Sequence, residues 1–501
     1  MKSTLAAETH PQPASDTSND RVQGNQASET DEARILERLF ELVKHHRDTA
    51  HIRKPLEFHE PEELEKLLNL DRPEGNGDWE QIFQWVQLYL KHSVKTGHPR
   101  FVNRMWSGAN LPSVVGEIIT AISNTSAGTF ESAPVSTLME TFMIQRMLEL
   151  VGFHNGEGQM TTGSSNANLI AMMAARNRAN HSIRQKGLFE QGPLYAFVSE
   201  DAHYSLDKAA NVLGIGLDHL VKIPVNNRGQ MDSQVLEKQL ARTVESGGTP
   251  FFVCATAGTT VRGAFDPITD IMALRERYHF WFHVDGAWGG AAIFSQKLRS
   301  RFLEGIEQVD SFTWDFHKMV GTALISNILL FNANGVLREA TDAGDTSYIF
   351  GSENRREDLN LGSFSLQCGR RVDSLKWFLD WKFYGEQGFA DRVESYLQLA
   401  EYTSQWIEDA AELEMVVPRE SFNVCFRFVA PAGISNNDFN QNLRTELHRN
   451  EIGLIGSGFV GPDFCLRLLI TNPRLDRSEI EAFLRDLVNA GRILVGKTWT
   501  H

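Results

Sequence analysis

The sequence predicts an α/β protein, with a mostly parallel central sheet in a large domain and a small C-terminal α+β domain. Three observations support this prediction. The chain has 501 residues, which is enough for two or more domains. Between about residues 100 and 390, short apolar runs alternate with helical stretches, as the strands and crossover helices of a parallel sheet do. After about residue 390 the pattern changes to a long helix, two strands and a final helix.

The strands of the large domain are predicted from short runs that are largely apolar, as expected for strands covered on both faces by helices. These runs are 195–198, 251–255, 281–285, 311–314 and 328–331. Helical stretches such as 204–213, 232–245 and 267–279 lie between the first three. The small domain is predicted from helix 391–411, strands 424–429 and 465–470, and a helix over 477–490.

The chain therefore divides into four predicted parts. Residues 1–30 contain no aromatic residue and are rich in small polar residues, which predicts a disordered tail. Residues 31–100 form an N-terminal helical segment, because apolar residues recur there at helical spacing. Residues 101–390 form the large domain and residues 391–501 the small one.

Composition argues against several classes of partner. The 49 Lys and Arg against 64 Asp and Glu give a net charge of −15, which disfavours a general nucleic-acid or anionic-membrane binder. No run approaches the ~20 apolar residues of a membrane span, and the start lacks the apolar region of a secretory signal. The four cysteines form no CxxC pair and the histidines no HExxH motif, so we expect no metal site and a cytoplasmic location.

Two segments offer binding groups at the starts of helices. The first is the loop TGSSNAN (162–168), followed by a helical run, where N–H groups and hydroxyls at a helix N-terminus suit a phosphate. The alternative is an ordinary serine-rich helix cap. In the second segment, His203 follows an apolar strand, where an imidazole can stack on a flat heterocycle. The alternative is a histidine of a surface loop.

Two further segments place ionisable groups at strand ends. Asp285, in HVDGAWGG, ends an apolar strand, and a buried carboxylate needs a partner such as a protonated ring nitrogen. A helix cap or an ion pair is the alternative. Lys318, in WDFHK, lies just past the next strand, where its amine can bond an aldehyde, although a solvated surface lysine is the common case. Together and in this chain order, the four segments are the parts that a pyridoxal 5'-phosphate site needs.

The sequence also resembles a known family over about residues 48–490. It is similar to the group II pyridoxal-phosphate-dependent amino-acid decarboxylases, in the branch of the glutamate, sulfinoalanine (cysteine sulfinate) and aspartate decarboxylases. The resemblance is carried by SVKTGHPRF (93–101), NTSAGTFESAPV (124–135), HYSLDKAANVLGIG (203–216), ATAGTTVRGAFDP (255–267), HVDGAWGG (283–290), FHKM (316–319) and QCGRRVD (367–373). It implies fold type I of the pyridoxal-phosphate enzymes, the aspartate aminotransferase-like fold.

The resemblance also implies roles for individual residues. Lys318 bonds the cofactor, Asp285 pairs with its ring nitrogen and His203 stacks on its ring. Arg467 grips the substrate carboxylate, and Tyr348 protonates Cα after carbon dioxide leaves. The remaining implied cofactor-binding residues are Gly163, Ser164, Ser165, Thr259, Ala287 and His317.

Four residues depart from the pattern of the family, and a fifth matches one of its branches. Phe316 stands where a proline is usual, and Asp315 replaces the usual asparagine. Arg104 stands where relatives have glutamine, and it adds a second anion contact or else forms an outward ion pair. Ser126 matches the sulfinoalanine-type enzymes. Gly128 replaces an aromatic residue, and we expect it to leave volume for a larger substrate side chain.

These features predict the α-decarboxylation of a small acidic L-amino acid, namely cysteine sulfinate, aspartate or glutamate, to the amine and carbon dioxide. A larger or basic substrate such as 2,4-diaminobutyrate is the alternative, and a catalytically silent binding protein is a remote one. The resemblance further implies a homodimer with its sites at the subunit interface, where the loop bearing Tyr348 comes from the neighbouring chain.

Overall fold

The computed structural model describes residues 29–49, 51–52, 54–70, 78–189, 192–341, 344, 347–350 and 357–498. Of the predicted tail, residues 1–28 lie outside these ranges. The helices are α1 (Glu29–Thr49), α2 (Pro61–Leu68), α3 (Trp79–His92), α4 (Leu111–Ser123), α5 (Pro134–Val151), α6 (Ser164–Ala179), α7 (Ile183–Lys186), α8 (Ser205–Val212), α9 (Ser233–Glu245), α10 (Ile268–Tyr278), α11 (Gln296–Phe302), α12 (Val336–Thr341), α13 (Ser347–Phe350), α14 (Ser374–Asp409), α15 (Asn436–Arg449) and α16 (Arg477–Thr498). The strands are β1 (Phe101–Val102), β2 (Glu157–Met160), β3 (Leu194–Ser199), β4 (Leu220–Ile223), β5 (Thr249–Thr256), β6 (Trp281–Asp285), β7 (Ser311–Asp315), β8 (Asn327–Phe331), β9 (Leu413–Met415), β10 (Asn423–Phe428), β11 (Leu454–Val460) and β12 (Asp463–Leu469).

The contacts of the chain divide it into two units. The first contains α1, α2 and α3, and the second contains all the other helices and strands. Within the first unit, Arg38 of α1 pairs with Glu80 of α3 at 2.7 Å and lies over the ring of Phe83. Phe83 is the buried residue of α3, so this contact fixes how α1 and α3 pack.

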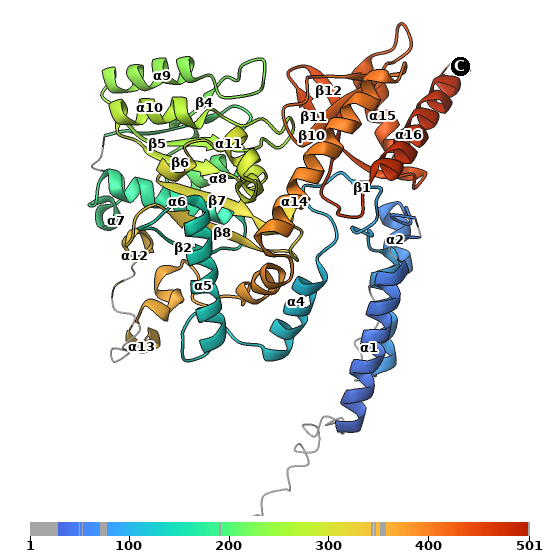
Figure 1. The fold of residues 1–501 in the computed structure, drawn as a ribbon, viewed down its shortest axis with the longest axis horizontal. Helices are drawn as coiled ribbons and strands as arrows, with labels where there is room; N and C mark the ends of the chain where they lie inside the picture. Colours follow the sequence, from blue (N-terminus) through green and yellow to red (C-terminus); the bar gives the residue numbers. More distant parts are fainter. Residues whose placement is uncertain are drawn as a thin grey trace, which may run out of the picture. The chain divides into compact units, whose positions relative to one another are not determined.

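A seven-stranded sheet forms the centre of the second unit (Figure 1). Its order is β2-β8-β7-β6-β5-β3-β4, and the strands from β4 to β7 are parallel. Only β8 runs against its two neighbours, β7 and β2. The predicted α/β class and mostly parallel sheet are therefore confirmed.

Both faces of this sheet are buried, which explains why its strands lack polar alternation. Successive residues of a strand point to opposite faces. In β5, Phe252 and Cys254 join a core with α6 and α8, whereas Val253 and Ala255 join the larger core on the other face. Because each face needs apolar side chains, the run is apolar throughout.

A five-stranded sheet, in the order β1-β11-β12-β10-β9, forms the smaller C-terminal layer. Its strands are antiparallel except for β1, which is parallel to β11. Residues 101–102, which open the predicted large domain, pair with β11 of this small sheet. Residue 390, the predicted end of that domain, lies inside α14, which contacts α4 and α5 as well as β9 and β10 of the small sheet.

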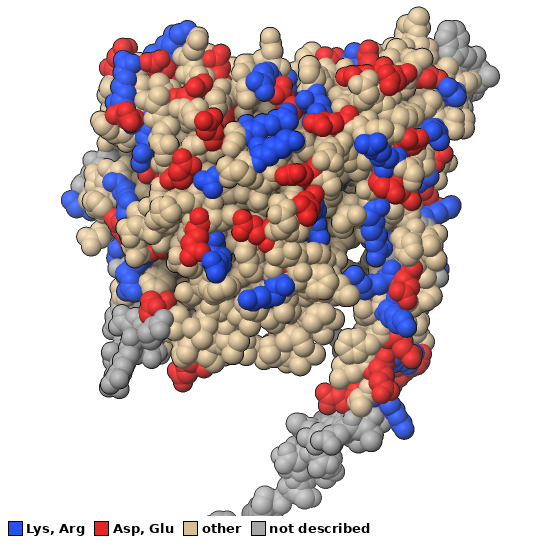
Figure 2. All heavy atoms as spheres, viewed as in Figure 1, with Lys and Arg blue, Asp and Glu red and all other residues tan. Residues whose placement is uncertain are grey.

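The surface carries both signs of charge. Over the face shown in Figure 2, acidic and basic side chains are interspersed. In the part of the chain that the structure describes, no helix is long and apolar enough to cross a membrane.

Candidate active site

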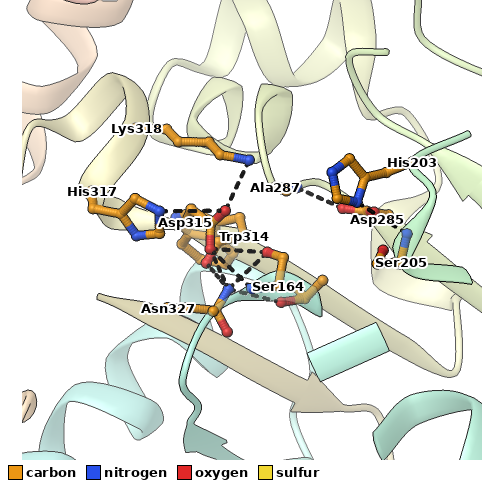
Figure 3. Close-up of polar contacts among 12 residues, drawn as sticks. Ser164, His203, Ser205, Asp285, Ala287, Trp314, Asp315, His317, Lys318 and Asn327 are labelled. Carbon is orange, nitrogen blue, oxygen red and sulfur yellow. Dashed lines mark hydrogen bonds and ion pairs between the residues drawn. The ribbon is translucent and has the colours of Figure 1, made fainter. Parts of the chain in front are cut away.

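The candidate site lies at the carboxyl ends of parallel strands, where open α/β sheets bind their ligands. β6 ends at Asp285 and β7 at Asp315, while the turn after β3 supplies His203 and the start of α6 supplies Ser164. Figure 3 shows these side chains together with Lys318, which follows β7. The sheet therefore brings together residues that are up to 154 positions apart, from 164 to 318.

Asp285 is a buried carboxylate that hydrogen bonds to neutral groups. Its side chain accepts from Asn168 Nδ2 at 2.8 Å and from the Ala287 N–H at 3.0 Å, and the residue is 3% exposed. Among the described residues, no lysine or arginine forms an ion pair with it. A buried carboxylate with this environment suits a protonated ring nitrogen as its missing partner.

A chain of hydrogen bonds behind Asp285 orients it. Asn168 Oδ1 lies 3.0 Å from His283 Nε2, and His283 Nδ1 lies 2.8 Å from Ser311 Oγ. Burial lowers the pKa of His283 to about 4, despite the opposing attraction of Asp285, so this imidazole is neutral. The sequence alone indicates no role for Asn168 or His283. The available signal was that Asn168 lies one helical turn after Ser164, on the same face of α6.

His203 lies beside Asp285 (Figure 3). Its Nδ1 accepts the Ser205 N–H at 3.3 Å, which fixes the ring after the strand. Burial lowers the pKa of His203, although Asp285 opposes this, so the ring is neutral at pH 7. A neutral imidazole held in this way is able to stack on a flat ring.

Lys318 and Asp315 form an ion pair. Lys318 Nζ lies 2.9 Å from Asp315 Oδ2, and Figure 3 shows the amine directed toward this carboxylate. Burial raises the pKa of Asp315, but Lys318, His317 and the hydrogen bond from Ser164 together lower it below its usual value. Asp315 is therefore ionised next to the lysine.

His317 and Phe316 hold the turn that carries Lys318. His317 Nδ1 contacts the backbone of Ser326, at 2.8 Å from its oxygen, and burial lowers the pKa of His317. Phe316 is fully buried and stacks on Trp377 of α14, with ring centroids 3.8 Å apart. The phenylalanine that replaces the usual proline thus anchors this turn to the core.

The loop that is predicted to hold the phosphate leads into α6, which begins at Ser164. Gly163 has a φ of 112°, which favours glycine, and precedes the first residue of the helix. Ser164 is buried and Ser165 is exposed. Both the N–H and the hydroxyl of Ser164 donate to Asp315 Oδ1, at 3.3 and 2.9 Å. Asn327, for which the sequence alone indicates no role, donates to the same oxygen at 2.7 Å.

Of the two other predicted cofactor-binding residues, Thr259 bonds within its own turn, whereas Ala287 contacts Asp285. The hydroxyl of Thr259 accepts the Ala264 N–H at 3.1 Å, and the residue is 1% exposed, so its hydroxyl stabilises its own turn. Ala287, two residues after Asp285, lies next to it in Figure 3 and donates its backbone N–H to the carboxylate.

Arg467 lies in β12 and is buried. Its guanidinium donates to the carbonyls of Thr260 and Asn103, and its Nε has no hydrogen-bond partner within the described residues. Burial lowers the pKa of Arg467, and the positive charges of Arg104 and Arg444 lower it further. Arg104 is itself exposed. The charges of Arg104 and Arg444 thus act on the guanidinium of Arg467.

The segment with Ser126 and Gly128 contacts residues 362–370. Ser126 Oγ accepts the Arg370 N–H at 3.1 Å, and the Gly128 carbonyl accepts the Gly362 N–H at 2.8 Å. The expectation that Gly128 leaves free volume is wrong in this structure. A Cβ at this position would lie 2.8 Å from the Cys368 carbonyl oxygen, so the backbone of the neighbouring segment fills the space.

Tyr348 lies in the short helix α13 and is 83% exposed. Figure 1 shows α13 at the edge of the second unit, near α12. The hydrogen bonds and ion pairs that join the site residues in Figure 3 do not include Tyr348. Its predicted role in protonating Cα stays a prediction.

Comparison with known proteins identifies the family. Residues 61–429 match the pyridoxal-dependent decarboxylase conserved domain. The chain belongs to this family. It is 36% identical to the cysteine sulfinic acid decarboxylase of Mus musculus over 476 residues, covering 92% of this chain and 96% of the relative. It is 37% identical to an acidic amino acid decarboxylase of Xenopus tropicalis over 380 residues, covering 76% and 74%.

A solved structure agrees with this assignment. The crystal structure of mouse CSAD in its apo form has a TM-score of 0.88 and 33% identity, covering 93% of this chain and 99% of that chain. The protein is thus a pyridoxal-phosphate-dependent amino-acid decarboxylase of fold type I, as the sequence predicted. The site residues fit this cofactor, because Asp285 is buried with no cationic partner among the described residues and Lys318 lies just past the end of the adjacent strand.

Proposed function

We propose that this decarboxylase acts on a small acidic L-amino acid, with cysteine sulfinate as the preferred substrate. The observation that carries the proposal is the buried guanidinium of Arg467, whose Nε–H has no hydrogen-bond partner among the described residues and on which the positive charges of Arg104 and Arg444 act. A substrate with a second acidic group gains from these positive charges, whereas a basic side chain is repelled. The names of the two relatives, at 36% and 37% identity, support the same class of substrate.

In this proposal the site residues bind the cofactor and the substrate, orient the bond that breaks and hold a proton at the ring nitrogen. When bound, pyridoxal 5'-phosphate supplies a ring that takes up the electron pair released as carbon dioxide leaves. Asp285 holds a proton at the ring nitrogen, and Lys318 holds the cofactor through its amine. Arg467 holds the substrate carboxylate, which fixes the orientation of the bond to be broken. His203 covers the ring.

We further propose a homodimer in which Tyr348 of one protomer delivers the proton to Cα in the site of the other. The exposure of Tyr348, and the position of its helix α13 at the edge of the second unit in Figure 1, support this arrangement. All four cysteines are free, which supports the expected cytoplasmic location.

A competition assay tests the substrate. Purified enzyme with added pyridoxal 5'-phosphate receives equimolar cysteine sulfinate, aspartate, glutamate and 2,4-diaminobutyrate, and the product amines are quantified by mass spectrometry. We expect hypotaurine, the amine of cysteine sulfinate, to dominate. Predominant diaminopropane would overturn the acidic-substrate proposal and leave the family assignment intact.

A substitution tests the part played by Arg104. We expect Arg104→Gln to raise KM for cysteine sulfinate about tenfold with little change in kcat, because one charged contact in the bound state is lost. Arg485→Gln, which removes an exposed arginine of α16, is the control and leaves both constants unchanged. An unchanged KM in Arg104→Gln would show that this side chain only faces solvent.

A further inference from the structure

The two donors at the start of α6 are already engaged by a carboxylate of the protein. The N–H and the hydroxyl of Ser164 both point to Asp315 Oδ1, at 3.3 and 2.9 Å (Figure 3). A backbone N–H and a hydroxyl at a helix N-terminus are the groups that bind a phosphate. Asp315 therefore occupies donors that the phosphate of the cofactor needs.

Asp315 is held firmly in this position. The residue is 4% exposed, Asn327 Nδ2 donates to its Oδ1 at 2.7 Å, and Lys318 Nζ contacts its Oδ2 at 2.9 Å. Its two oxygens thus face different partners, the helix start on one side and the lysine on the other. Both the phosphate donors and the cofactor-bonding amine are engaged by one side chain.

The charge of Asp315 sets it apart from an amide of the same shape. A carboxylate accepts hydrogen bonds but donates none, and two anions that share one set of donors repel each other. An asparagine at this position would offer Ser164 only a neutral acceptor, which a phosphate displaces more readily, and would present an N–H₂ group to the phosphate.

We propose that Asp315 is an internal competitor of the cofactor phosphate, which must displace the carboxylate from Ser164 in order to bind. In the cofactor-free enzyme, Asp315 then engages both Ser164 and Lys318. The phosphate group therefore adds less to the affinity for the cofactor than it would if residue 315 carried an amide. Cofactor loading is consequently weak and readily reversible. The inference rests on membership of the family and is independent of the substrate proposed above.

The test compares pyridoxine 5'-phosphate with pyridoxine, which differ only in the phosphate and lack the aldehyde that bonds Lys318. Isothermal titration of the full-length, cofactor-free enzyme at pH 7.5 gives the ratio of their association constants, which measures the contribution of the phosphate. We expect Asp315→Asn to raise this ratio at least about tenfold, because a charged acceptor no longer holds the donors of Ser164. A ratio that stays within about twofold of wild type, or falls, overturns the proposal.

Two further variants separate competition from a general disturbance. Asp310→Asn changes the partly buried acid just before β7, which pairs with Arg275 and accepts the Phe282 N–H, and is expected to leave the ratio unchanged. Ser164→Ala lowers the ratio strongly in the Asp315→Asn background and only weakly in wild type, where the donor is already engaged. Equal effects of Ser164→Ala in both backgrounds contradict the proposal.

A second substitution covers the case in which Asp315→Asn does not fold, as judged by circular dichroism. Asp315→Ser removes the carboxylate with a smaller side chain and is expected to raise the ratio in the same direction. A folded Asp315→Ser variant with an unchanged ratio overturns the proposal.

Discussion

The carboxylate of Asp285 is oriented by neutral groups rather than by a cation. Asn168 donates to it, and His283 and Ser311 extend the chain behind Asn168. Because each of these groups is neutral, the negative charge of Asp285 stays available for a cationic partner in the site. This arrangement buries the imidazole of His283, and burial makes its protonation unfavourable.

That imidazole makes the stability of the fold dependent on pH. His283 has a pKa of about 4 in the folded protein, chiefly through burial, against ~6.5 in an unfolded chain. Between these values the unfolded chain binds more protons, so the free energy of unfolding falls as the pH drops from 6.5 to 4. The full difference is about 3 kcal/mol.

Urea unfolding at several values between pH 4.5 and 7 measures this dependence. We expect His283→Asn to flatten it, while His154→Asn, which changes an exposed histidine, leaves it unaltered. Burial raises the pKa of Asp266 to about 7 and that of Asp380 to about 6. These two carboxyl groups make the free energy of unfolding rise as the pH falls, which opposes the effect of His283. Only the difference between variant and wild type is therefore informative, and equal slopes in the two would contradict the assignment.

At the scale of elements, a buried ion pair joins three segments near the phosphate loop. Arg370 and Glu140 of α5 lie 2.5 Å apart, with side chains 5% and 2% exposed. Glu140 also accepts the Met160 N–H of β2 at 3.0 Å, and Arg370 donates to the Ala127 carbonyl at 2.9 Å. The pair thus fixes the 126–128 segment against β2, just before Gly163.

Neutralising this pair is expected to be costly. We expect Glu140→Gln to reduce the free energy of unfolding by about 3–5 kcal/mol, because it leaves Arg370 as an unpaired buried charge. Glu149→Gln breaks an ion pair with Arg146 on the same helix, at half-exposed side chains, and costs less than about 1 kcal/mol. Chemical denaturation measures both, and similar values for the two would show that Arg370 finds another partner.

Much of the large sheet could be predicted because its strands are buried on both faces. Strand β6 has the predicted bounds, and β3, β5, β7 and β8 contain the predicted runs. Strand β2 was missed because its first residues are polar, and β4 because it is short and lies at the edge of the sheet. The direction of β8 is a property of the long-range pairing, which no local pattern encodes.

Lys318, Asp285 and His203 could be singled out from the sequence because these residue types themselves carry chemistry, and their roles stay predictions. Asn168 and His283 escaped notice because they act only through other residues. Asp315 was visible as a departure from the family, but its contact with Ser164 depends on the end of β7 meeting the start of α6. Such a contact exists only in the folded chain.

At the scale of the whole molecule, α4 leaves an apolar face uncovered. One side of this helix packs on α14, where a Cβ on Gly116 would lie 2.7 Å from the Lys376 Cα. Apolar side chains on its other side are exposed, and nearby α5 also exposes apolar side chains. They are Leu111, Val115, Ile119 and Ile122 of α4, and Val135, Leu138 and Phe142 of α5. An apolar surface of this kind is typical of a subunit interface.

The proposed homodimer therefore makes a prediction about this face. Ile119 and Ile122 are 46% and 66% exposed, so a charge at either position is tolerated by the isolated subunit but not by an apolar interface. We expect the double variant Ile119→Glu/Ile122→Glu to sediment as a folded monomer and to lose decarboxylase activity, because each site lacks the Tyr348 of the other protomer. Ile493→Glu, on the exposed face of α16, is the matched control and leaves both the mass and the activity unchanged. A monomer that retains activity would show that Tyr348 of the neighbouring chain is not needed for the reaction. A variant that stays dimeric would show that this face is not the subunit interface.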